Sequence, residues 1–259
     1  MRWATMAIGS RQSAISNQVV AALSTTDCPL PTAAPALVGV MGVVLEAFRE
    51  GALWWADESL LAVADLHLEK GSSFARRGQL LPPYDTGETL ARLAVLVAHL
   101  HPKVVVALGD SFHDDDGALR LPPRDRAALA ALQSGRDWIW IAGNHDSSLP
   151  DSLDGMRLDG LAVGPLVFRH EPAAGAADGE IAGHLHPAAR VAGRGKSVRR
   201  RCFAGDGYRL ILPAFGAYAG GLDVSDRAFA GLFRAESFRA FVLGDDRVYP
   251  VGPRALRAG

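Results

Sequence analysis

The sequence predicts a single α/β domain in which two β-sheets pack together between helices, a four-layer αββα sandwich. Three apolar runs of strand length support this prediction, and they span residues 60–64, 104–108 and 138–142. Continuous apolar runs suit strands that are buried on both faces of a sheet. Helix-like segments lie between these runs and shorter strand-like segments follow them, so both kinds of element are expected to share one core.

Two helices are expected between the apolar runs. The first begins at Asp85. Asp85 and Glu88, three residues later, together resemble a capping box. Its apolar residues form one stripe, which consists of Leu90, Leu93, Val97 and Leu100. The second follows two prolines at residues 122–123, runs through residues 127–132 and ends at Gly135.

The C-terminal half is expected to be mostly β-structure, with glycine-rich turns and no internal repeat. Its short strand-like segments span residues 166–168, 180–182, 208–212 and 241–243. In open α/β sheets, ligand sites lie at the carboxyl ends of the strands. Polar motifs that follow the expected strands should therefore meet in one place.

Residues 1–37 differ from the rest of the chain. They are rich in Ser, Thr, Ala and Pro and show no clear period. We expect a poorly ordered N-terminal extension there, with Met41 as an alternative start, and one folded domain over residues 38–259.

Composition indicates a globular protein: 259 residues, 49% of them hydrophobic, with a formal net charge of −1. This charge argues against electrostatic coating of nucleic acid but leaves room for a local basic groove. Cys28 and Cys202 lie far apart and form no CxxC pair, so two reduced thiols are expected. With neither a signal-peptide pattern nor an apolar run near the ~18 residues that span a membrane, a cytoplasmic location is expected.

Five short motifs combine oxygen and nitrogen ligands without a thiolate. They are Asp65-Leu66-His67, the 109–113 segment Gly-Asp-Ser-Phe-His, the 143–146 segment Gly-Asn-His-Asp, His170, and the 183–186 segment Gly-His-Leu-His. Such a mixed set suits Mn²⁺, Fe or Zn²⁺ better than a cysteine-rich structural zinc site. Any one motif is weak evidence, but five in this order are strong.

The motifs supply enough ligands for two metal ions that share a carboxylate. Asp65 and His67 stand two residues apart after a strand, so an extended backbone would direct both side chains to one ion. Asp110 can bridge two ions through its two oxygens. The remaining ligands are Asn144, His170, His184 and His186. Two ions ~3.5–4 Å apart clamp a phosphate and activate water, so the sequence predicts a two-metal phosphoesterase.

Three further motif residues are predicted to act on the substrate. His145 should stabilise the transition state or protonate the leaving oxygen, with Asp146 orienting its imidazole. His113 is either a second imidazole that faces the substrate, which we favour, or a metal ligand. His99, His101 and the acidic run 114–116 are expected to lie outside the site, as solvated or packed groups.

The motif order D-x-H, G-D-x-x-H, G-N-H-D, H and G-H-x-H resembles the calcineurin-like metallophosphoesterase superfamily over roughly residues 60–190. This resemblance implies a metallophosphoesterase sandwich with two divalent ions. One ion would take Asp65, His67, Asp110 and His186 as ligands. The other would take Asp110, Asn144, His170 and His184.

Within the superfamily, the 109–114 segment with residues 143–146 resembles nucleases, including repair nucleases of the SbcD type. A closer resemblance is to ligase-associated DNA damage response endonucleases, through residues 64–71, 81–86, 168–172 and 213–218. It implies a bacterial, Mn²⁺-dependent DNA phosphodiesterase that acts beside a DNA ligase and a helicase in repair.

A basic stretch near the last histidine motif is a candidate DNA contact. It contains Arg199, Arg200 and Arg201, together with Arg190, Arg194 and Lys196. An ordinary solvated strand end is about equally plausible, and it is the better interpretation for Arg76 and Arg77. No helix-turn-helix or zinc finger is present, so DNA binding should rest on backbone contacts and weaken with salt.

Two alternatives remain at this stage. One is a hydrolase of small phosphodiesters or phosphomonoesters from the same superfamily. The other is a non-catalytic scaffold, which the complete ligand set and His145 speak against. The aromatic residues of the C-terminal part have two candidate uses, a homodimer face and core packing, and we favour core packing. They are Phe215, Tyr218, Phe229 and Phe233.

Overall fold

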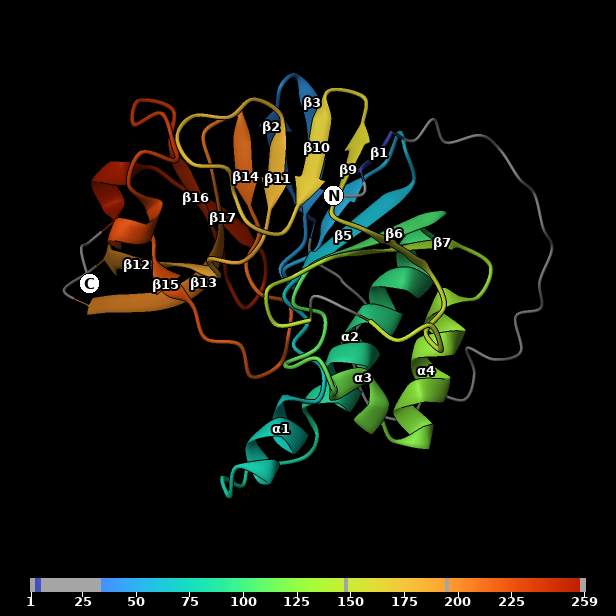
Figure 1. The fold of residues 1–259 in the computed structure, drawn as a ribbon. Coiled ribbons are helices and arrows are strands. Elements are labelled where there is room, and N and C mark those ends of the chain that lie inside the picture. Colours follow the sequence, from blue (N-terminus) through green and yellow to red (C-terminus); the bar gives the residue numbers. More distant parts are fainter. Residues whose placement is uncertain (1–2, 6–33, 147–148, 194–195, 257–259) are drawn as a thin grey trace.

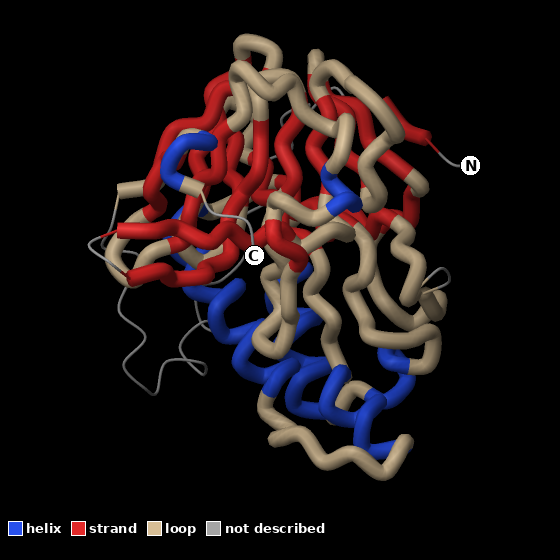
Figure 2. The backbone as a smooth tube through the Cα atoms, turned by 90° about the vertical axis from the view of Figure 1, so that its left-hand side faces the viewer, coloured by secondary structure: helices blue, strands red, loops and turns tan. Residues whose placement is uncertain are grey.

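Two β-sheets pack face to face in the computed structural model, which describes residues 3–5, 34–146, 149–193 and 196–256. Figure 1 shows the sheets side by side, with the α-helices beneath them, and Figure 2 shows the same division from the side. The predicted α/β sandwich is confirmed. None of the helices in the described part of the chain is long and apolar enough to cross a membrane.

The first sheet has seven strands in the order β2-β3-β4-β5-β6-β7-β8. Their bounds are Ala36–Val40, Val43–Ala47, Leu53–Trp55, Leu60–Ala64, Val104–Leu108, Asp137–Ile141 and Met156–Leu158. The pairs from β5 to β8 are parallel. Two predicted strands coincide with β5 and β6, and β7 begins one residue before the predicted run. Every residue of β5 and β6 is buried, which agrees with their continuous apolar sequence.

Helices cover the outer face of this sheet. They are α1 (Lys70–Arg76), α2 (Asp85–Leu100), α3 (Gly117–Arg120) and α4 (Pro123–Gln133). The predicted stripe of α2 packs on the sheet with Leu90 and Leu93 fully or nearly fully buried. The predicted capping box is wrong, because the N-cap is Tyr84 and no side chain caps this helix. The carboxylate of Asp85 instead accepts a hydrogen bond from the amide of Gly71 at 3.0 Å.

The second sheet has ten strands, with β1-β9-β10-β11-β14-β13-β12-β15 in one path and β16 and β17 beside β13. Their bounds, in chain order, are Trp3–Thr5, Gly160–Val163, Leu166–Arg169, Glu180–Ala182, Pro187–Gly193, Lys196–Gly205, Arg209–Ile211, Leu222–Asp223, Arg239–Leu243 and Val248–Val251. The largest apolar cluster lies between the two sheets and joins residues such as Val106 and Ile139 to Phe168 and Phe203. The sandwich is therefore stabilised chiefly by burial of apolar side chains.

The outer face of the second sheet carries loops and a short 3-10 helix, η2 (Arg227–Phe229), and the described residues contain no α-helix there. Phe229 and Leu232 pack on Ile211 of β14. A second 3-10 helix, η3 (Pro253–Ala255), lies near the C-terminus. Phe215 and Phe229 are buried, so core packing rather than a dimer face accounts for both.

The N-terminal extension is described only at its two ends. Trp3–Thr5 form β1, which pairs in parallel with β9 at the edge of the second sheet. Residues 6–33, which include Cys28, lie outside the described residues. Regular structure resumes at Ala36, two residues before the predicted domain start.

Candidate metal centre

Loops after neighbouring strands bring the predicted ligands together. Asp65 follows β5 and Asp110 lies two residues after β6, in the first sheet. His170 follows β10 and His184 lies two residues after β11, in the second sheet. Both sheets therefore contribute ligands to one place at the edge of the sandwich, as expected for an open α/β site.

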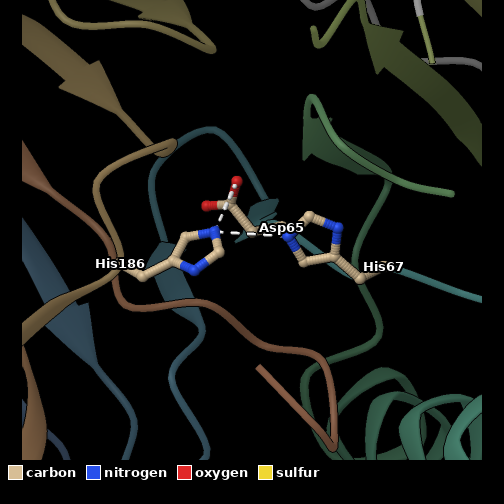
Figure 3. A group of neighbouring side chains, drawn as sticks. All are labelled: Asp65, His67 and His186. Atoms are coloured by element: carbon tan, nitrogen blue, oxygen red, sulfur yellow. Dashed lines mark hydrogen bonds and ion pairs between the residues drawn. The ribbon is translucent and has the colours of Figure 1, made fainter. Parts of the chain in front are cut away.

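The first ligand cluster consists of Asp65, His67 and His186, with one ligand atom of each within 4.8 Å of the others. His186 Nε2 lies 3.2 Å from Asp65 Oδ1 and 3.3 Å from His67 Nε2. Figure 3 shows a nitrogen of the His186 ring directed at both the Asp65 carboxylate and the His67 ring. The structure thus assembles three of the four ligands predicted for the first ion.

The second ligand cluster consists of Asp110, His170 and His184. His170 Nε2 lies 3.1 Å from His184 Nδ1 and 2.9 Å from Asn144 Oδ1. The other ring nitrogen of His170, Nδ1, donates a hydrogen bond to the Leu108 carbonyl at 3.0 Å. Nε2 of a neutral His170 therefore carries a lone pair, which faces the lone pairs of the Asn144 oxygen. A cation would stabilise this close approach, so the residues fit a metal ion.

Asp110 lies where the two clusters adjoin. Its Oδ1 accepts a hydrogen bond from the His145 amide at 2.9 Å and lies 3.4 Å from His170 Nε2. Asp65 Oδ1 of the first cluster lies 3.8 Å from His170 Nδ1. These distances place Asp110 in the second cluster, and its role as a bridge between two ions stays a prediction.

Five of the predicted ligands have a positive φ angle, a left-handed backbone conformation that residues other than glycine rarely adopt. Among the described residues, nine that are not glycine have positive φ, and five of these are predicted ligands. They are Asp65 (54°), His67 (44°), Asp110 (44°), His184 (70°) and His186 (45°). The sequence argument from an extended backbone is therefore wrong, although Asp65 and His67 do lie in one cluster. Conformations of this kind cost on the order of 1–3 kcal/mol each and gather at functional sites.

Two glycines make room for the ligands. A Cβ on Gly109, whose φ is +69°, would lie 2.4 Å from the ring of His170. A Cβ on Gly143 would lie 2.1 Å from the amide nitrogen of Asp110. Gly109 precedes Asp110 and Gly143 precedes Asn144. Because no side chain fits at either position, these glycines allow the ligands of the second cluster to approach one another.

The protonation of the histidines also suits metal binding. Burial, together with the nearby imidazoles of His186, His113 and His145, lowers the pKa of His67 to about 2. Burial and the neighbouring His170 also lower the pKa of His184. Burial lowers the pKa of His186 as well, but its hydrogen bond to Asp65 and the negative charges of Asp65 and Asp110 together outweigh burial, and the net shift is upward. His67 and His184 are therefore neutral near pH 7, as a metal ligand must be.

His145 and His113 form a pair of imidazoles beside the clusters. Their rings stack, with centroids 5.4 Å apart and planes inclined by 21°. His145 is 42% exposed and its Nε2 lies 4.0 Å from Asp110 Oδ2, whereas its Nδ1 contacts the His113 carbonyl at 3.1 Å. Burial, and after it the charge of Lys70, lowers the pKa of His113 to about 4. His113 belongs to neither cluster, and its role as an imidazole that faces the substrate stays a prediction.

Asp146 has a different role from the predicted one. Its Oδ2 accepts hydrogen bonds from the amides of Ser111 and Phe112, and both ring nitrogens of His145 have other neighbours. The prediction that Asp146 orients the imidazole of His145 is therefore wrong. Burial, with a smaller contribution from the charge of Asp110, raises the pKa of Asp146 to about 7. The residue holds the loop that carries Asp110.

The residues of the predicted basic stretch differ in their exposure and in their hydrogen-bond partners. Arg199 is exposed and donates to the Gly221 carbonyl. Arg200 pairs with Asp245 at 3.2 Å, and Arg201 donates to the Ala214 carbonyl at 2.7 Å. Arg190 of β12 stands opposite Arg199 in the sheet register. Arg194 and the side chain of Lys196 lie outside the described residues.

The groups expected to lie outside the site do so. His99 and His101 are exposed at the end of α2. The carboxylate of Asp114 binds the guanidinium of Arg120 at 2.7 and 2.9 Å, and Asp116 pairs with Arg76 at 3.0 Å. Arg77 is exposed at the end of α1.

Two residues near the clusters had no predicted role. Lys70 donates to the Tyr218 carbonyl at 2.9 Å, and its ammonium lies 5.9 Å from the ring centre of Phe74. The Phe74 ring lies 5.5 Å from that of His113. A cation three residues after His67 is the sequence signal that would have identified Lys70 as a neighbour of the site.

Comparison with known proteins agrees with this geometry. The model of calcineurin-like phosphoesterases matches residues 59–206, which include all seven predicted ligands. The crystal structure of the nuclease MPE from Pseudomonas putida is 27% identical, with a TM-score of 0.60 over 84% of this chain and 100% of that chain. Among curated proteins, none matches the chain. The family match covers more than half of the residues, and the chain therefore belongs to the calcineurin-like phosphoesterases, a family of metal-dependent hydrolases.

Proposed function

We propose that this phosphoesterase is a two-metal endonuclease that hydrolyses DNA phosphodiester bonds. The observation that supports this most directly is the contact between the two clusters and an exposed imidazole. His145 Nε2 lies 4.0 Å from Asp110 Oδ2, beside both sets of ligands. A phosphate held at the clusters would lie within reach of a proton donor.

The ligand atoms of the two clusters would hold the ions. Asp65, His67 and His186 would serve one ion and Asn144, His170 and His184 the other, with Asp110 between them. When bound, the two ions neutralise phosphate charge and supply a hydroxide nucleophile near neutral pH. We propose Mn²⁺ because the set mixes carboxylate, amide and imidazole donors, a choice that the resemblance to Mn²⁺-dependent nucleases also supports.

His145 is the proposed proton donor to the leaving oxygen. Its Nδ1 faces the His113 carbonyl at 3.1 Å and donates to it, so the imidazole acts as an acid only when a second proton is bound at Nε2. Nε2 is the nitrogen that faces Asp110 and the clusters. The carbonyl therefore fixes the tautomer and directs the transferable proton toward the place where a leaving oxygen would stand.

DNA as the substrate and repair as the context are supported by similarity rather than by geometry. The nuclease MPE is similar over its whole length, and the motifs resemble ligase-associated DNA damage response endonucleases. We accordingly propose a cytoplasmic repair role in a bacterium, together with a DNA ligase and a helicase. Co-purification of the three proteins from cells that express a tagged chain tests this association, and recovery of neither partner contradicts it.

The experiment that tests the proposed activity is Mn²⁺-dependent cleavage of circular single-stranded DNA by the purified protein. A circle has no ends, so cleavage requires an endonuclease. His145→Ala run in parallel excludes a contaminating nuclease. We expect this variant to keep both metals and to lose turnover on the order of 10²-fold or more, as for the loss of a positioned general acid.

The same assay separates DNA from small substrates. Bis-p-nitrophenyl phosphate is a phosphodiester without flanking nucleotides. If the protein hydrolyses this compound in the same buffer and leaves both circular and linear DNA intact, the two-metal site is retained and DNA is the wrong substrate.

A further inference from the structure

The segment between β14 and β15 connects the two halves of the first cluster. Phe215 donates its amide hydrogen to the Ala64 carbonyl at 2.8 Å, immediately before Asp65. At the other end, the amide of Leu222 donates to the His186 carbonyl at 3.1 Å. In Figure 1 this stretch is the orange loop that leads into β15. Residues 214–222, the connecting segment, thus run past the first cluster from one ligand loop to the other.

Two cations from different elements donate hydrogen bonds to carbonyls of this connecting segment. Lys70 of α1 donates to the Tyr218 carbonyl at 2.9 Å, and Arg199 of β13 donates to the Gly221 carbonyl. Lys70 also stands three residues after His67, whereas Gly221 directly precedes the residue that contacts His186. The two positive charges therefore bind carbonyls that lie three residues apart, on the segment that links the two ligand loops of the first cluster.

Neither cation is neutralised within the described part of the chain. Lys70 contacts one carbonyl and the face of the Phe74 ring, and Arg199 contacts one carbonyl. Neither side chain forms an ion pair with a carboxylate of the described residues. An ammonium has three N–H donors and a guanidinium has five, so both keep donors for a further acceptor. Lys70 is half-buried and Arg199 is exposed, so both can be reached from solvent.

The two neighbouring arginines of β13 are less available to a DNA strand. Arg200 is directed to Asp245 and is neutralised by it. Arg201 lies deeper and donates to the Ala214 carbonyl, and burial lowers its pKa to about 10. Of the three arginines that the sequence offered as DNA contacts, Arg199 is the exposed one that contacts the connecting segment without an acidic partner.

We propose that Lys70 and Arg199 bind the phosphates on either side of the scissile phosphate, so that a DNA strand crosses the first cluster along the connecting segment. This inference rests on the proposed DNA phosphodiesterase function and names the residues that would separate DNA from small phosphodiesters. An ammonium and a guanidinium that recognise phosphate give backbone contacts without base readout. The strand should therefore bind regardless of sequence and weaken with salt.

The test uses the full chain with Mn²⁺ and compares Lys70→Gln and Arg199→Gln with two matched controls. Lys103→Gln removes an exposed lysine at the start of β6, at the far end of the strand from Asp110. Arg239→Gln removes an exposed arginine that also donates to a carbonyl, that of Phe238, at 2.7 Å. It pairs with Gly205, about 20 Å along β13 from Arg199.

Two readouts are measured for each variant. The first is kcat/KM for a single-stranded oligonucleotide divided by kcat/KM for bis-p-nitrophenyl phosphate. We expect this ratio to fall about tenfold in Lys70→Gln and in Arg199→Gln, because each loses a charge-assisted hydrogen bond. The second is the salt dependence of DNA binding in a His145→Ala background. Its slope against log salt should decrease by about 0.7 for each lost phosphate contact.

Each outcome decides the matter. A lower ratio and a smaller slope in the two variants but not in the controls support the inference, and Lys70→Arg should restore most of both. Equal effects in Lys103→Gln and Arg239→Gln, or unchanged values in Lys70→Gln and Arg199→Gln while the wild type cleaves DNA, overturn it. If the wild type neither binds nor cleaves DNA, the proposed function fails and this inference fails with it.

Discussion

The carboxylate of Asp146 accepts a hydrogen bond from the backbone amide of Ser111, with 2.7 Å between Oδ2 and the nitrogen. The same oxygen accepts from the amide of Phe112 at 3.0 Å. Asp146 is 2% exposed, so these two amides have little access to water as an alternative partner. The last residue of one motif therefore fixes the loop that carries Asp110, the central ligand of another.

Asp146→Ala should consequently destabilise the fold and the metal site together. It leaves two buried amide donors without an acceptor, which costs roughly 2–4 kcal/mol in all. Denaturant titration measures the loss of stability, and titration with Mn²⁺ measures the loss of metal affinity. Asp146→Asn keeps an oxygen acceptor and should recover most of the stability. A variant with alanine that is as stable as the wild type contradicts this account.

Asp110→Ala should release both metals rather than one. Asp110 belongs to the second cluster and is predicted to bridge the two ions, and its carboxylate also accepts a hydrogen bond from the amide of His145. Elemental analysis of the purified protein gives the metal content. Asp114→Ala is the matched control, because it removes a nearby carboxylate that binds Arg120 and should keep both metals. Two metals retained in Asp110→Ala would refute the bridging assignment.

Gly109→Ala should disable the second cluster. The added methyl would lie 2.4 Å from the ring of His170, so that ring must move away from Asn144 and His184. Gly135→Ala is the control for backbone strain, because Gly135 has a similar φ of +76° and open space around it. Both variants should lose some stability, but only Gly109→Ala should lose metal and turnover. Equal metal content in the two variants would show that the close approach to His170 has no consequence.

Cys202 should resist alkylation in the folded protein at pH 8. It is fully buried among Ala189, Ala240 and Val242, and burial raises the pKa of its thiol. A raised pKa keeps the thiol protonated, and the thiolate is the reactive form. Peptide mapping after treatment with iodoacetamide should find Cys202 unmodified in native protein and modified in denaturant. Rapid labelling of the native protein would place the thiol at the surface.

Sequence patterns predicted the parts of the fold that depend on local periodicity. The apolar runs gave β5 and β6 without error, because strands buried on both faces have no alternation to misinterpret. The motif residues also converge as expected, since loops after parallel strands end at the same edge of a sheet. The grouping of Asp65, His67 and His186, and of Asp110, His170 and His184, is the one that the resemblance implied.

Features that depend on tertiary contacts were not predictable in this way. The left-handed backbone at Asp65 and His67 is imposed by the surrounding loops, and no local signal marks it. Asp85 lacks its capping role because the amide of Gly71, in another helix, takes the carboxylate. Arg199 and Arg200 have different surroundings because successive side chains along β13 point to opposite faces of the sheet. The position of β13 in the sheet, which decides what each face meets, is defined only by the fold.

The division of ligands between two sheets has a consequence for the order of assembly. His67 and His186 are 119 residues apart in the chain, and they meet only after both sheets have docked. Neither half of the chain alone can offer a complete metal position to solution, so metal uptake follows docking and then opposes separation of the sheets. Each ion would act as a crosslink that closes a long loop. A chelator would therefore lower the stability of the packed sheets as well as abolish hydrolysis.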